Sequence, residues 1–314
     1  MRQFRFIGWR VLQAIPSVLM VSLLTFLMLR MVPGDPARVL AGPRASAETI
    51  ERVRSSMGLD EPVWMQYFLY VGRAVRGDFG YNLTGSSPVL DIVSKAAAVT
   101  GALAVVALLL TLAVSLSLAL LAARRPGGIA DGIARVFSVG GLALPTFWIA
   151  LMLIVLVALP TGLFPVGGWP AAGFDRQLNA VILPAVTLSL SVSPILVRSL
   201  RSSLLEVLGS DYVLSARAIG VGRGRLLWAY VIRNGLLPSI PLMAVIVGFL
   251  LGGTVVVETA FNLPGLGQVL VNAVSNRDAN LVQGIVLVLG TLIILVYLLA
   301  DVLLSLVDPR ARQR

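Results

Sequence analysis

The feature of this chain that most restricts its fold is a set of apolar stretches too long for the core of a soluble domain. No charged residue lies between Lys95 and Arg124, and a second uncharged stretch runs from Val136 to Gly173. A helix needs about 20 mostly apolar residues to cross the hydrocarbon core of a bilayer. Charged residues make up 13% of the chain, whereas soluble domains carry about 25%. The sequence therefore predicts an integral membrane protein.

Six segments have the length and composition of a spanning helix. The first follows several arginines but is longer than the apolar region of a signal peptide, about 7–15 residues, so we expect a retained span. The prediction is an all-α integral membrane protein with six transmembrane helices, whose core covers residues 97–307. The expected spans are residues 11–30, 97–123, 136–159, 178–198, 236–257 and 281–303.

The distribution of arginine predicts the orientation. If the amino terminus is cytoplasmic, fifteen arginines lie on cytoplasmic segments and two, Arg176 and Arg277, lie in short outer loops. Basic residues favour the cytoplasmic side in short loops, whereas long loops contribute little to orientation. We therefore expect both termini to be cytoplasmic. The first span then lies in residues 1–30, an outer loop in 31–96, a cytoplasmic loop in 199–235 and a cytoplasmic tail in 308–314.

The outer loop of residues 31–96 is expected to form a small helical insertion. Ser46 can cap a helix that ends at Gly58 and carries three apolar residues on one face, Ile50, Val53 and Met57. A second helix would begin near Pro62. Its apolar positions could lie on the outer membrane surface: Trp64, Tyr67, Phe68 and Val71. A small packed cap and a docking site for a partner are both compatible with this pattern.

The residue types of the chain exclude several kinds of chemistry. The chain contains no cysteine and no histidine, which removes disulfides, thiolate or imidazole metal sites and Ser-His-Asp triads. It has no G-x-x-x-x-G-K-[ST] loop to hold nucleotide phosphates. Ionisable residues occur only near the ends of the expected spans, as with Arg30, Arg198 and Asp301, whereas ion-coupled carriers place such groups near the midplane. An uphill transport step would therefore need energy from another chain.

The cytoplasmic loop of residues 199–235 is longer than a helix connection requires, since about 2–8 residues suffice. Ser210 and Asp211 can cap a short helix over residues 212–219, and Gly220 can take the left-handed position after it. Three residues would share one narrow face of this helix, Tyr212, Ala216 and Ile219.

A second amphipathic stretch follows in the same loop, after the sequence Gly-Arg-Gly-Arg at 222–225. Its apolar residues face one way: Leu226, Leu227, Tyr230 and Val231. One interpretation is a hairpin held at the lipid headgroups by arginines. The other is a cytoplasmic knob that enters a groove of a partner protein.

Residues 211–220, with the sequence DYVLSARAIG, and 233–238, RNGLLP, resemble the cytoplasmic "EAA" loop of bacterial ABC importer permeases. The Ala-Arg-Ala core is similar to the dipeptide/oligopeptide branch of that family. Landmarks elsewhere occur in the family's order and on the expected loops. They are VPGDPA at 32–37, GLDEP at 58–62, GDFG at 77–80, Glu258, Phe261, PGLG at 264–267, Arg277-Asp278 and DPR at 308–310.

The chain also departs from the family pattern. The loop lacks the glutamate that names the motif, as is usual in this branch. Ile219 stands where a lysine commonly precedes the glycine, and Tyr230 where a histidine is common. Ala279-Asn280 replaces a usual Tyr-Pro after Arg-Asp. These changes concern the fit to a partner and one outer turn.

The resemblance implies a type I ABC importer permease fold in a bacterial cytoplasmic (inner) membrane, with the long outer loop of a B-type subunit. The implied partners are a second, C-type permease, two ATPase subunits that bind ATP and Mg, and an extracytoplasmic peptide-binding protein. It implies no cofactor in this chain, and the basic residues are interpreted as topology signals beside lipid headgroups, not as a nucleic-acid site. The implied ATPase-coupling residues are Asp211, Tyr212, Ser215, Ala216, Arg217, Ala218, Ile219 and Gly220.

Two other classes of function stay open at this stage. One is an ion-coupled secondary carrier or a channel of six helices, which co-purification of ATPase subunits would argue against. The other is an intramembrane enzyme, although the spans lack an acidic pair with which to perform chemistry. Within the importer family, the cargo could be dipeptides, oligopeptides, glutathione, a nickel chelate or sugars.

The orientation can be tested by thiol labelling, because the native chain contains no cysteine. In intact cells we expect an impermeant maleimide to label Ser86→Cys and not Gly222→Cys, since the first lies in the outer loop and the second in the cytoplasmic loop. Permeabilised cells provide the control, in which both variants should react. Labelling of Gly222→Cys in intact cells would reverse the topology.

Overall fold

The computed structural model describes residues 2–31, 36–42, 45–56 and 58–307. These residues form helices and no β-sheet, apart from an isolated antiparallel bridge between Tyr81 and Pro88. Part of one family landmark, residues 32–35, and all of another, residues 308–310, lie outside the described residues, as does Met57. The chain divides into two compact units, one of residues 1–7, 101–263 and 296–314 and the other of residues 8–100 and 264–295.

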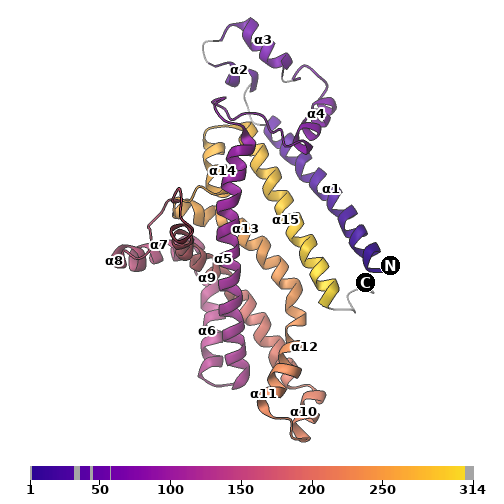
Figure 1. The fold of residues 1–314 in the computed structure, drawn as a ribbon, viewed down its shortest axis with the longest axis vertical. Coiled ribbons are helices and arrows are strands. Elements are labelled where there is room, and N and C mark those ends of the chain that lie inside the picture. The colour runs from indigo at the N-terminus through magenta and orange to yellow at the C-terminus, as the bar shows by residue number, and fades with distance from the viewer. Residues whose placement is uncertain (1, 32–35, 43–44, 57, 308–314) are drawn as a thin grey trace. The chain divides into compact units, whose positions relative to one another are not determined.

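The second unit contains most of helix α1 (Arg2–Met31) and the insertion that follows it (Figure 1). The insertion consists of α2 (Pro36–Ala41), α3 (Ala47–Ser56) and α4 (Val63–Val75). Ser46 caps α3 as expected, since its hydroxyl accepts a hydrogen bond from the Thr49 amide at 3.2 Å. Gly58 has a φ of +67° after this helix, the left-handed conformation that glycine adopts without strain.

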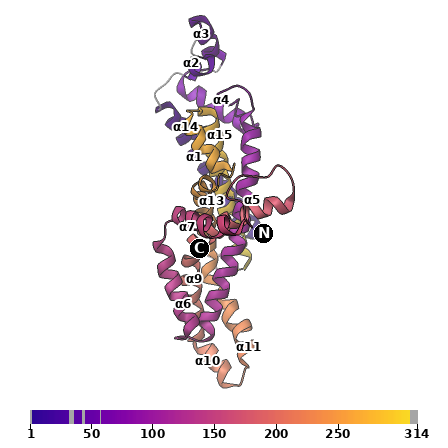
Figure 2. The same ribbon diagram turned by 90° about the vertical axis from the view of Figure 1, so that its left-hand side faces the viewer.

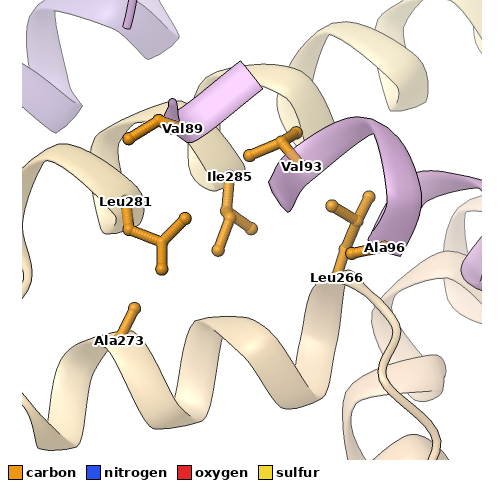
Figure 3. Packing of buried hydrophobic residues seen from close by; sticks show 7 residues of the cluster. All are labelled: Val89, Val93, Ala96, Leu266, Ala273, Leu281 and Ile285. Carbon is orange, nitrogen blue, oxygen red and sulfur yellow. The ribbon is translucent and has the colours of Figure 1, made fainter. Parts of the chain in front are cut away.

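The core of the second unit forms where three helices meet. They are the first turns of α5 (Val89–Arg124), the short α14 (Leu266–Ser275) and the first turns of α15 (Ala279–Val307). Figure 3 shows side chains of all three helices pointing toward one another. The buried cluster consists of Val89, Val93, Ala96, Leu266, Ala273, Leu281 and Ile285.

A carboxylate links two loops of the second unit. Asp278 is buried, and its Oδ2 accepts a hydrogen bond from the Leu83 amide at 2.8 Å. Its Oδ1 accepts another from the Leu281 amide in the first turn of α15. Asn280 adds a bond from its side-chain nitrogen to the Tyr81 carbonyl at 2.9 Å, which proline, usual at this position in the family, could not make. The Arg277-Asp278 landmark therefore holds the loop that follows GDFG.

The first unit is organised around α9 (Phe174–Leu208), the most buried of its long helices. In the most apolar 18-residue stretch of α9, 72% of the residues are buried. This helix packs against α6 (Ile129–Ala143), α7 (Thr146–Leu153) and α13 (Ile240–Ala260). The two helices α6 and α9 come close together at Gly141, where an added Cβ would lie 2.5 Å from Cγ of Pro194. A cluster of Ala122, Ala134 and Val197 joins α5, α6 and α9 within this unit.

The segment of residues 136–159, expected as one span, does not form a straight helix. It contains the end of α6 and then α7, the π-helical η1 (Ile154–Ala158) and α8 (Leu159–Thr161), with a bend of 104° between the two parts. The break lies at Leu144, which is extended at φ −90° and ψ 121° before Pro145. Proline clashes with an α-helical residue before it, which explains the break.

The loop after α8 is anchored on the end of α13 in the same unit. The Gly168 amide donates a hydrogen bond to the Phe261 carbonyl at 3.1 Å. A Cβ at Gly167 would lie 2.5 Å from that carbonyl oxygen, so the contact requires glycine. The landmark residues Glu258 and Phe261 therefore lie at the end of α13, where the loop after α8 is hydrogen-bonded.

By length and hydropathy, five helices of the described residues can cross a membrane, and the bent pair brings the number to six. The five single candidates contain three of the other expected spans and overlap most of the remaining two, 11–30 and 281–303. The five candidates are Gly8–Met28, Val89–Arg124, Phe174–Leu208, Leu226–Ala260 and Ala279–Ala300. The all-helical membrane fold predicted from the sequence is therefore confirmed.

Two adjacent glycines of α6 provide a test of the packing against α9. Gly141→Ala should destabilise the protein by about 1–3 kcal/mol, because the new methyl group overlaps the rigid ring of Pro194. Gly140→Ala is the matched control, because nothing lies within 4 Å of its Cβ position and alanine favours helix. Heating of the detergent-solubilised protein followed by size-exclusion chromatography should show a lower apparent Tm for Gly141→Ala only. Equal Tm values would contradict the close packing.

Candidate functional site

The connection between α9 and α13 contains the residues that the sequence marked as functional. It consists of α10 (Asp211–Ala218), α11 (Arg223–Arg225), the π-helical η2 (Leu226–Ile232), α12 (Arg233–Gly235) and the 3₁₀ turn η3 (Leu237–Ser239). Figure 2 shows α10 and α11 next to each other at one end of the first unit. The loop is therefore a small helical hairpin.

The start of α10 differs from the expectation in its capping. Ser210 occupies the cap position, but its hydroxyl donates to the Val207 carbonyl at 2.6 Å and does not cap the helix. The amides of Val213 and Leu214 donate to the backbone carbonyl of Ser210, each at 3.0 Å. Asp211 is the first helical residue, where the positive end of the helix dipole stabilises a negative charge. The helix thus covers residues 211–218, not 212–219.

The end of α10 is as predicted. Gly220 has a φ of +86°, and the Val221 amide donates to the Ala216 carbonyl while the Gly220 amide donates to that of Arg217, both at 3.1 Å. This pair of bonds is the Schellman motif, which requires a left-handed residue at the position of Gly220. The turn reverses the chain and brings α11 and η2 back beside α10.

The three residues expected on one face of α10 lie in different environments. Ala216 is 5% exposed, and with Val213 it packs inside the hairpin and against the end of α9. Tyr212 and Ile219 are 45% and 82% exposed. Ala216 therefore cannot present its methyl group to a partner, and its role is to attach α10 to the rest of the loop.

The residues of α10 that remain accessible form what we call the knob surface. Its apolar members are Tyr212, Leu214 and Ile219, and it also contains the exposed charges of Asp211 and Arg217. With the exposed Ser215, Ala218 and Gly220, it includes every marked residue except Ala216. Tyr212 and Ile219 lie on the same side of the helix, and a short folded element with exposed apolar side chains of this kind is suited to a groove of another protein.

The returning arm of the hairpin is amphipathic, as the sequence indicated. Leu226 and Val231 are buried, and Leu227 and Tyr230 are partly buried. Gly235 in α12 lies against α9, where a Cβ would be 2.7 Å from Cδ2 of Leu204. This contact attaches the arm to the long helix that precedes the loop.

A buried ion pair fixes α9 before it enters the loop, and sequence reasoning missed it. Asp131 in the first turn of α6 has a side chain 3% exposed, and its Oδ1 lies 2.5 Å from Nε of Arg201 in α9. The Gly127 amide and Arg135 also contact its Oδ2, at 3.1 and 3.3 Å. Removing one partner of a buried pair typically costs about 3–5 kcal/mol, because the other charge stays buried. The spacing of Asp131 and Arg135 was visible in the sequence, whereas the contact with Arg201 depends on the fold.

The Schellman turn can be tested with a second pair of glycines. Gly220→Ala should loosen the end of α10, because an alanine at positive φ is strained by about 1–2 kcal/mol. Gly224→Ala, in α11 with open space around its Cβ position, should have no such effect. Hydrogen–deuterium exchange should become faster in residues 211–221 of the first variant and stay unchanged in the second. Unchanged exchange in Gly220→Ala would show that the turn does not hold the helix.

Comparison with known proteins agrees with the motifs of this loop. Residues 115–313 match the family described as the inner membrane component of binding-protein-dependent transport systems. Residues 3–117 match the N-terminal region of the membrane component of such systems. Together the two matches cover nearly all of the chain.

Individual relatives are similar over their whole length. The chain is 37% identical over 336 residues to the dipeptide transport system permease DppB of Escherichia coli (strain K12), with 99% of each chain covered. It is 35% identical over 306 residues to the glutathione transport system permease GsiC of the same strain, covering 97% of this chain and 98% of the relative. A probable peptide ABC transporter permease of Sinorhizobium fredii is 35% identical over 305 residues, with 96% and 97% covered. The chain belongs to the family of inner membrane permease components of binding-protein-dependent ABC transport systems.

Proposed function

We propose that this chain forms half of the translocation pathway of an ABC importer for dipeptides or oligopeptides. The observation that carries the proposal is the similarity over nearly the whole chain to permeases whose names specify peptides, a dipeptide and glutathione. The other half of the pathway would be a homologous C-type permease. An extracytoplasmic peptide-binding protein would deliver the cargo.

The energy for import would come from two ATPase subunits beneath the permeases. The family is one of transporter subunits without a catalytic site of their own, so ATP and Mg would be bound by those partners. A secondary carrier or channel is not favoured by the family match. The same match supports a multi-pass location in the inner membrane. With the arginine distribution, we place the termini and the α10 hairpin in the cytoplasm.

The knob surface of α10 is the element proposed to contact an ATPase subunit. The helix has eight residues, about 12 Å at 1.5 Å per residue, which is too short to be stable alone. Its own chain holds it through Val213 and Ala216, and this leaves Tyr212 and Ile219 free to enter a groove. Movement of the ATPases would then be transmitted through the hairpin to α9, to which α12 and α10 are attached. Such coupling requires a differential contact with two states of the ATPases.

Ile219 provides the sharpest test of this contact, because its side chain is 82% exposed and touches little of its own chain. Ile219→Glu should abolish co-purification of the ATPase subunits and peptide uptake, since it places an unpaired charge in the proposed interface. The control is Ile219→Lys, the residue that the family resemblance places there, which should keep both. Both variants should reach the membrane in normal amounts. Wild-type uptake by Ile219→Glu would exclude the knob surface from coupling.

Ala216→Glu has a different expected result from Ile219→Glu. Because Ala216 is buried within the hairpin, a glutamate there should unfold the loop and not merely weaken an interface. Limited proteolysis should therefore cut the loop in Ala216→Glu and leave it intact in Ile219→Glu. Equal resistance of the two variants would contradict the assignment of Ala216 to the packed side.

A further inference from the structure

Helix α4, which follows α3 in the insertion (Figure 1), has three faces with different surroundings. The first packs on α1, where Tyr67 and Tyr70 lie against Phe26 with ring centroids 5.5 and 6.0 Å apart. The second, which we call the polar face, carries the exposed charges of Arg73 and Arg76, with Leu69, 45% exposed, between them. The third, between them, we call the outer strip of α4. It consists of Trp64, Phe68 and Val75, which are 60%, 64% and 83% exposed.

The three residues of the outer strip lie on the same side of α4. They stand at i, i+4 and i+11, three turns of one helix face at 3.6 residues per turn. Phe68 has one ring contact, with Tyr67 at 6.0 Å between centroids, and both aromatic side chains of the strip are still more than half exposed among the described residues. An apolar strip of this kind on a folded element marks contact with another molecule or with a membrane.

The contacts of α4 with α1 place the helix at the level of the bilayer. The Tyr67 hydroxyl hydrogen-bonds with the Ser22 hydroxyl at 2.9 Å and with the Leu19 carbonyl at 3.1 Å. Both partners lie inside the apolar span Gly8–Met28, and Ser22 is about 9 Å from its end at 1.5 Å per residue. Arg30, just beyond the span, donates a hydrogen bond to Gln66 of α4. One turn of α4 therefore lies beside the hydrocarbon part of α1.

The environment of α1 indicates what covers the outer strip. Only 17% of the residues in the span of α1 are buried, and its exposed residues are apolar, among them Leu19, Leu23 and Leu27. A spanning helix with this surface faces lipid over much of its circumference. The outer strip continues that apolar surface, and the polar face of α4 adds two arginines that can reach lipid phosphates. Tryptophan and phenylalanine on one face with arginine on another is the pattern of a helix lying in the interface of a membrane.

We propose that α4 is an interfacial helix whose outer strip is immersed in the lipid of the outer leaflet, beside the end of α1. Trp64 and Phe68 contact acyl chains, while Arg73 and Arg76 lie at the headgroups. The helix thereby anchors the insertion between α1 and α5 to the membrane surface. This proposal does not depend on the cargo or on the ATPase contact.

Site-directed spin labelling tests the proposal directly, since the native chain has no cysteine. The full-length chain, in the assembly with which it purifies, is reconstituted in vesicles of phosphatidylethanolamine and phosphatidylglycerol. A nitroxide is attached at Phe68→Cys, at Trp64→Cys or at Arg73→Cys, the matched control on the polar face of the same helix. Collision rates are measured with oxygen, which concentrates in lipid, and with a water-soluble nickel chelate. The signal of the cysteine-free parent is subtracted.

We expect oxygen to exceed the nickel chelate in collisions with the labels at Phe68 and Trp64, and the reverse at Arg73. Peptide uptake or, without known cargo, normal elution of each variant on size exclusion shows that the labelled chain is folded. Access of the nickel chelate to Phe68 equal to that at Arg73 would overturn the proposal, because the strip would then face water. An immobile label at Phe68 that neither reagent reaches, with or without the binding protein, would also overturn it, because protein would cover the strip.

Discussion

A backbone in hydrocarbon must satisfy its own hydrogen bonds, and this requirement governs the whole chain. In the described residues the long apolar stretches meet this requirement as helices, whose backbone bonds lie within one segment. The requirement also decides what happens where helices stop. At Pro145 the helix breaks, the loop at Gly168 uses the free carbonyl of Phe261, and Asp278 accepts the amides of two separate segments. Irregular backbone thus occurs where other groups of the same unit replace the missing helical bonds.

Charge is used sparingly, and its placement has two different purposes. Exposed arginines at helix ends and in loops suit the headgroup region and the topology. Asp131 is different, because burial would be unfavourable without Arg201, Arg135 and the Gly127 amide. This pairing holds the end of α9 on α6 at the place from which the helical hairpin extends. The coupling proposed for α10 would need such a rigid base, since movement of α10 would otherwise be lost in the loop.

The hairpin combines a packed side with an accessible one. Val213 and Ala216 attach α10 to its own chain, and the Schellman turn at Gly220 sets the angle of return. The knob surface is therefore presented by a folded element and not by a flexible loop, which lowers the entropy lost on binding. In α4 the same division appears, with tyrosines facing α1 and the outer strip left accessible. Each short helix is stabilised through one face and free to bind through another.

The sequence by itself determined the all-helical membrane class, the family and the caps at Ser46 and Gly220, because hydropathy, motifs and turn chemistry are local properties. It did not determine which side of α10 is buried, since the expected face included both Ala216 and the exposed Ile219. The bend at Pro145 had a local signal that was outweighed by the apolar length of residues 136–159. The pairs Asp131–Arg201 and Asp278–Leu83 join residues far apart in the chain. Only the tertiary structure decides such contacts, because they depend on which helices pack together.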